Sequence, residues 1–131
     1  MRRALQLLDD DNPDGIVLLE AGLLGALMLD PTLRLYSSVQ SLRSTDFAGK
    51  HRGAAFAAVM DERHPELALV VDRLERDGVP PPHGRTGWGD ALARLLDMAV
   101  VDDEAVPEAA RRIKEAAMAR RLKALGRRDV A

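Results

Sequence analysis

The sequence predicts an all-α protein, a small helical bundle with an antiparallel helical hairpin at its carboxyl end. Three observations predict this class. Apolar residues recur at helical spacing, and no segment long enough for a strand shows the alternating apolar and polar pattern that strands require. Aromatic residues make up only 3% of the 131 residues, so leucine and alanine must build the core. Proline and glycine residues divide the chain into segments of helix length.

The amino-terminal segments contain the most informative helix. We expect a short helix over residues 3–8 and a type I turn at Asn12-Pro13-Asp14-Gly15, which has favoured residues at its turn positions. A helix over 16–29 follows, and it is apolar on nearly every side, as a buried central helix would be. Gly22 and Gly25 each cost about 1 kcal/mol of helix propensity relative to alanine. Because a helix accepts this cost where another backbone must come close, we expect close helix packing at both. The helix ends before Pro31, because proline disfavours the α conformation in the preceding residue.

The sequence of the middle of the chain predicts three more helices. A short one over 32–39 is followed by one over 46–62, which Ser44 or Thr45 can cap. Pro65 suits the first turn of a helix over 65–76, and Asp77-Gly78 should end it. Residues 79–87 contain three consecutive prolines and should form a loop.

The last two predicted helices, over 88–99 and 107–125, should form the hairpin, because the link between them is short and polar. Such a long final helix has more apolar length than a small body can cover, which indicates an oligomer interface. An alternative is that its apolar stripe only covers the protein's own core. The expected interface residues are Leu92, Leu95, Leu96, Val106, Ala110, Ile113, Ala117, Met118, Leu122 and Leu125.

Length favours a single domain, residues 1–131, divided into a globular bundle (1–87) and the hairpin (88–128). A net charge of −2 gives no global attraction to nucleic acid or to a membrane. The chain has no cysteine, which excludes disulfides and cysteine-ligated zinc. No apolar run reaches the roughly 20 residues that span a bilayer, and no secretion signal is evident. We therefore expect a cytoplasmic protein.

Catalytic and metal-binding patterns are weak. No Gly-x-x-x-x-Gly-Lys-(Ser/Thr) loop for nucleotides occurs, so we expect no ATPase activity, no catalytic residues and no cofactor. Asp10, Asn12 and Asp14 resemble the start of a calcium loop, but its twelfth position is Ala21, not glutamate. We expect no metal site. The basic last helix offers possible phosphate contacts, although cations also suit a helix carboxyl end: Arg111, Arg112, Arg120 and Arg121.

A family resemblance rests on three motifs. The first is a glutamate followed by Leu-Leu-Gly and an apolar run that ends in aspartate, over residues 20–30. The second pairs Asp46-Phe47 with Phe56, and the third is a helix pattern ending at Gly78. Over roughly residues 13–121 the chain resembles the amino-terminal domain of DnaB-type replicative DNA helicases. The helicase-binding domain at the carboxyl end of primase shares this fold.

The resemblance implies a non-catalytic oligomerisation and docking domain that acts in DNA replication, in the primosome. It implies homodimers formed through the hairpin, three of which can assemble into a collar, and binding of primase or a helicase loader. DNA would be bound weakly or through the rest of a helicase. The alternatives are a small nucleic-acid-binding protein that uses the basic last helix, and a primase-like module that binds a helicase.

Overall fold

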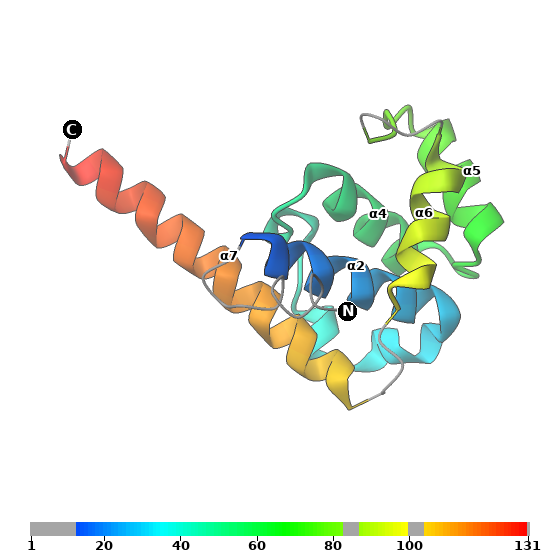
Figure 1. Cartoon of the computed structure of the whole chain (residues 1–131), viewed down its shortest axis with the longest axis horizontal. Helices are drawn as coiled ribbons and strands as arrows, with labels where there is room; N and C mark the ends of the chain where they lie inside the picture. The colour runs from blue at the N-terminus through cyan, green and yellow to red at the C-terminus, as the bar shows by residue number, and fades with distance from the viewer. Residues whose placement is uncertain (1–12, 83–86, 100–103, 131) are drawn as a thin grey trace.

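The computed structural model describes residues 13–82, 87–99 and 104–130. Within these ranges every regular element is helical and there is no strand, which confirms the predicted all-α class (Figure 1). The predicted helix over 3–8 lies outside the described residues. The elements are α2 (Pro13–Leu29), the 3₁₀-helix η1 (Pro31–Leu35), α3 (Ser37–Gln40), the 3₁₀-helix η2 (Ser44–Asp46), α4 (Lys50–Asp61), α5 (Leu67–Arg76), α6 (Trp88–Asp97) and α7 (Ala105–Val130).

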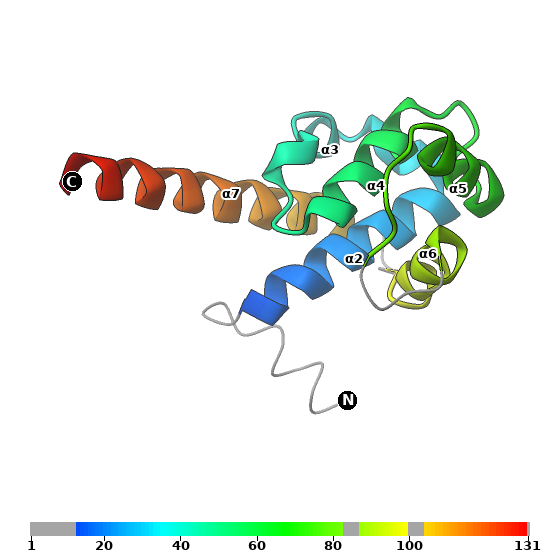
Figure 2. The same ribbon diagram turned by 90° about the horizontal axis from the view of Figure 1, so that it is seen from above.

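Helix α2 is the centre of the fold, as the sequence predicts. It packs against α4, α6 and α7, and residues 20–28 are all buried (Figures 1 and 2). Leu23, Leu24 and Leu27 have no exposed surface. The helix begins at Pro13 and not at Ile16, so the predicted turn is wrong from Pro13 onward. Proline is preorganised for the first helical turn, and here it starts the helix.

The predicted close packing is confirmed at Gly25. A Cβ atom built there would lie 2.3 Å from the carbonyl oxygen of Leu95 and 3.0 Å from the Cα of Ala99. Glycine therefore lets the backbones of α2 and the end of α6 approach each other. Gly22, one turn earlier, is also buried.

The predicted helix over 46–62 begins later than expected, because Ser44–Asp46 form the separate 3₁₀-helix η2 and α4 starts only at Lys50. Phe47 is extended, with φ −78° and ψ 135°, and its ring lies 4.7 Å from that of Phe56. Burial of this aromatic pair in the core outweighs continuation of the helix. Helix α5 ends as predicted, because Gly78 adopts the left-handed conformation with φ 70°.

The predicted antiparallel hairpin is wrong in the part of the chain that the structure describes. Helix α6 packs on α2 and α5, whereas α7 packs on α2, α3 and η2. The two helices lie against different parts of α2 and do not pair with each other. The physical reason is that α2 is apolar on nearly every side and so accepts both. Helix α6 therefore belongs to the globular body, and of these two helices only α7 extends from it.

Candidate interaction surface

The first half of α7, residues 105–117, lies inside the protein's own core. Val106, Ala110, Ile113 and Ala117 are at most 1% exposed, and Leu92 of α6 is fully buried. The expectation that these five side chains face a second copy is therefore wrong, because the body already covers them. Leu95 and Leu96 are half-buried against the same core.

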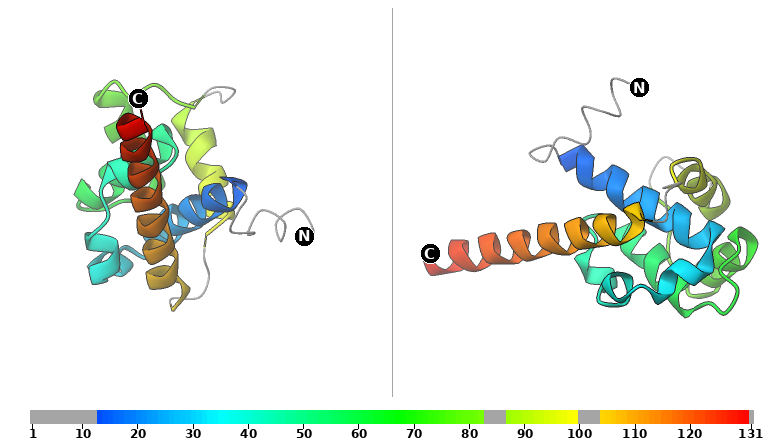
Figure 3. Two further views of the ribbon diagram at one scale, coloured as in Figure 1. Left: turned by 90° about the vertical axis from the view of Figure 1, so that its left-hand side faces the viewer. Right: turned by 90° about the horizontal axis from the view of Figure 1, so that it is seen from below.

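The second half of α7, residues 118–130, extends beyond the body (Figures 1 and 3). Here the exposed fractions of Met118, Leu122 and Leu125 are 53%, 68% and 55%. At about 100° per residue, these three side chains lie within roughly 60° of one another around the helix. We call them the distal stripe. It is the part of the predicted interface that solvent can reach.

The distal stripe does not continue the buried stripe of the first half. Helical geometry places it roughly 130° around α7 from Ile113 and Ala117. Those two residues face the protein's own core, so the distal stripe points away from the body. Its side chains are therefore oriented toward solvent.

A buried carboxylate holds α7 at the point where it leaves the body. Asp46 has no exposed surface, and its carboxylate accepts hydrogen bonds from Arg43 N at 2.8 Å, Lys114 Nζ at 2.9 Å and Arg121 Nη2 at 2.5 Å. Its carbonyl oxygen accepts one from Arg120 at 2.8 Å. Burial alone raises the pKa of Asp46, but these hydrogen bonds outweigh it and lower the pKa below 3.8. We call this cluster the Asp46 joint.

The four cations predicted as phosphate contacts all have protein partners. Arg120 and Arg121 donate hydrogen bonds to Asp46. Arg111 pairs with Glu108 and Glu115, and Arg112 with Glu108 at 3.0 Å. The two guanidiniums lower the pKa of Glu108 to about 2. These contacts favour the interpretation of the basic residues as intramolecular ion pairs.

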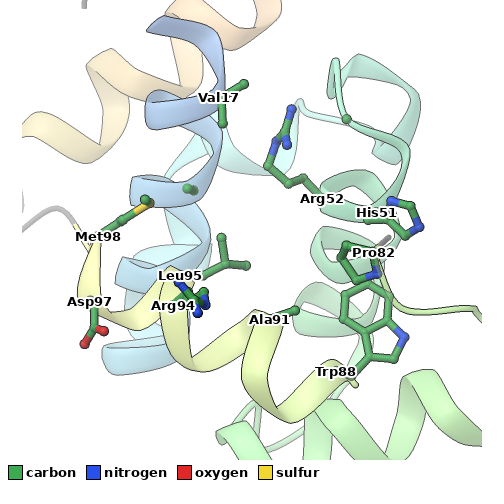
Figure 4. Close-up of a pocket in the computed structure, with 12 residues that line it drawn as sticks. Val17, His51, Arg52, Pro82, Trp88, Ala91, Arg94, Leu95, Asp97 and Met98 are labelled. Carbon is green, nitrogen blue, oxygen red and sulfur yellow. The ribbon is translucent and has the colours of Figure 1, made fainter. Parts of the chain in front are cut away.

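A second surface is a hollow of about 380 Å³ between α2, α4 and α6 (Figure 4). Val17, Leu95, Met98 and Trp88 give it apolar walls, and Arg52, Arg94 and Asp97 add charged groups of both signs. Sequence reasoning did not predict this hollow.

The Arg52 side chain is also bound to a buried carboxylate. Its Nε lies 2.7 Å from Glu20 of α2, which is fully buried and also accepts bonds from the backbone amides of Ala48 and Gly49, at 2.6 and 3.3 Å. A glutamate inside an otherwise apolar helix is the sequence signal that could have indicated this network.

Within the described residues, no three histidine or acidic side chains are placed to hold a metal ion. Among the described helices, none combines the length and apolar character that a membrane crossing requires. No protein-family model matches the chain, and comparisons with curated proteins and with solved structures give no match either.

Proposed function

We propose that this protein is a non-catalytic oligomerisation and docking domain of the kind found at the amino terminus of DnaB-type replicative helicases. One observation carries the proposal: α7 projects from the body, and the exposed distal stripe lies on the side of the helix that faces away from the body. Contiguous exposed apolar side chains commonly mark sites of protein association. The first half of α7 serves as the rigid base, and the distal half joins copies of the chain.

The sequence motifs support the choice of family. The run over residues 20–30 that resembles the helicase domain forms the buried part of α2, and the Asp46-Phe47 motif supplies both the joint and an aromatic core contact. In this proposal, copies joined through α7 form a cytoplasmic collar that receives primase or a helicase loader. Size-exclusion chromatography of the protein mixed with a helicase hexamer, and separately with a primase, tests which partner co-elutes.

Analytical ultracentrifugation tests the self-association. We expect the wild-type protein to form dimers or larger species as concentration rises, and Leu122→Asp to give a folded monomer, because a charge on the distal stripe opposes its burial. Ala124→Asp is the matched control, since Ala124 is exposed on the same segment but lies roughly 160° around the helix from Leu122. If wild type and Leu122→Asp are both monomers at high concentration, the proposal fails.

A further inference from the structure

The distal stripe is too small to form a stable interface with a second stripe alone. It covers seven residue steps, or about 11 Å of helix at 1.5 Å per residue. A specific interface buries roughly 1,000 Å² or more, which two sets of three side chains do not provide. A second copy must therefore offer a wider acceptor surface.

A groove between α4 and α5 has the form of such an acceptor. Its volume is about 350 Å³. Small and apolar side chains line it, so a row of larger side chains could pack there as one helix packs into the groove between two others. The lining residues are Ala54, Ala57, Ala58, Leu74 and Val79.

The rim of this groove is acidic. Asp61 of α4 and Asp77 at the end of α5 both pair with Arg73, and Glu62 lies 3.6 Å from the same guanidinium. Three carboxylates therefore share one guanidinium, which leaves this rim with a net charge of −2. Residues 118–126 contain Arg120, Arg121 and Lys123 and no acid; the two arginines bind Asp46 of their own chain, so Lys123 is the cation that can meet the groove. The distal part of α7 and the groove are therefore complementary in charge.

The second half of α7 does not reach the α4–α5 groove of its own chain. Helix α7 extends away from the body on the side opposite α5, and the views in Figures 1 and 2 agree on this separation. Contact between the two surfaces therefore requires two molecules.

From this complementarity we infer that the α4–α5 groove of one copy binds the distal stripe of α7 from a second copy. Leu122 packs over Ala57 and Ala58, and Lys123 beside it approaches Asp61 and Asp77. The inference rests on the proposed self-association and specifies its geometry. Such head-to-tail contacts close into rings when the rotation between copies permits and otherwise form filaments.

Disulfide trapping tests the geometry directly, because the chain has no native cysteine. Ala57 and Leu122 are both exposed, so each can be changed to cysteine with little effect on folding. We expect an oxidised mixture of Ala57→Cys and Leu122→Cys to give a disulfide-linked dimer on a non-reducing gel. The control mixture of Ala57→Cys and Ala124→Cys should give at least about tenfold less.

The outcomes separate this inference from the proposed function. If Leu122→Cys forms disulfides mainly with itself and not with Ala57→Cys, the distal stripes of two copies pair with each other. The inference is then wrong, but the proposed self-association stands. If the wild-type protein associates but Ala57→Cys forms no disulfide with Leu122→Cys or with Ala124→Cys, the inference is also wrong. If the wild-type protein is a monomer at all concentrations, both proposals fail.

A charge exchange provides a second measurement. We expect Asp61→Lys to weaken self-association about tenfold, and the double variant with Lys123→Glu to recover most of it, since the exchange restores opposite charges. Circular dichroism checks that each variant is folded. Equal association by wild type, the single variant and the double variant would overturn the role of the acidic rim.

Discussion

The two halves of α7 have similar apolar spacing but opposite surroundings. Ile113 and Ala117 in the first half are at most 1% exposed, whereas Leu122 and Leu125 in the second half are more than half exposed. The difference arises because the body ends near Ala117 and the apolar face rotates by roughly 130° there. Apolar periodicity therefore predicts a helix, but it does not say whether the same chain or another one covers it.

The largest expected loss of stability tests whether the first half of α7 is part of the core. We expect Ile113→Asp to destabilise the protein by about 3–5 kcal/mol, because it places a charge among fully buried side chains. Urea unfolding followed by circular dichroism measures this. An unchanged unfolding midpoint would show that the first half of α7 is not part of the core.

An intermediate effect is expected at the boundary between the halves. Asp46→Asn removes the charge that holds Lys114 and Arg121, and should cost about 1–3 kcal/mol at neutral pH. Because the pKa of Asp46 is lowered from 3.8 in the folded protein, its contribution is present above about pH 4 and is lost as pH falls through the folded pKa.

Urea unfolding of both proteins from pH 7 to pH 3 measures this dependence. The stability difference between wild type and Asp46→Asn should be constant near neutral pH and should shrink toward pH 3. A difference that does not depend on pH would show that the ionised carboxylate is not what holds α7.

The smallest expected effect belongs to the second half. Leu125→Asp should change the stability of the dilute monomer by no more than about 0.5 kcal/mol, because the side chain is already 55% exposed. Thermal unfolding at low micromolar concentration is the measurement. A loss comparable to that of Ile113→Asp would mean that the distal stripe packs within its own chain.

Local sequence signals predicted much of the fold. The burial of α2, the close approach at Gly25 and the end of α5 at Gly78 each follow from a residue's own chemistry. The hairpin could not be predicted correctly, because periodicity does not identify which surface a helix packs against. The division between η2 and α4 depends on the distant burial of Phe47.

Apolar spacing was enough to name the expected interface residues, but it does not say which of them the body covers. Met118, Leu122 and Leu125 are exposed as an interface requires, but recognising their direction needs the position of the body. The Asp46 joint connects residues 68 and 75 positions apart, and no local pattern predicts such a contact.

The buried Glu20 network has a consequence for how the chain folds. A carboxylate without water is strongly unfavourable unless its partners are present, and here they come from the backbone at Ala48 and Gly49 and from Arg52. Helix α2 therefore gains a stable burial of Glu20 only when the start of α4 is already in place. The two segments should form cooperatively, and hydrogen exchange should protect their amides as a single unit.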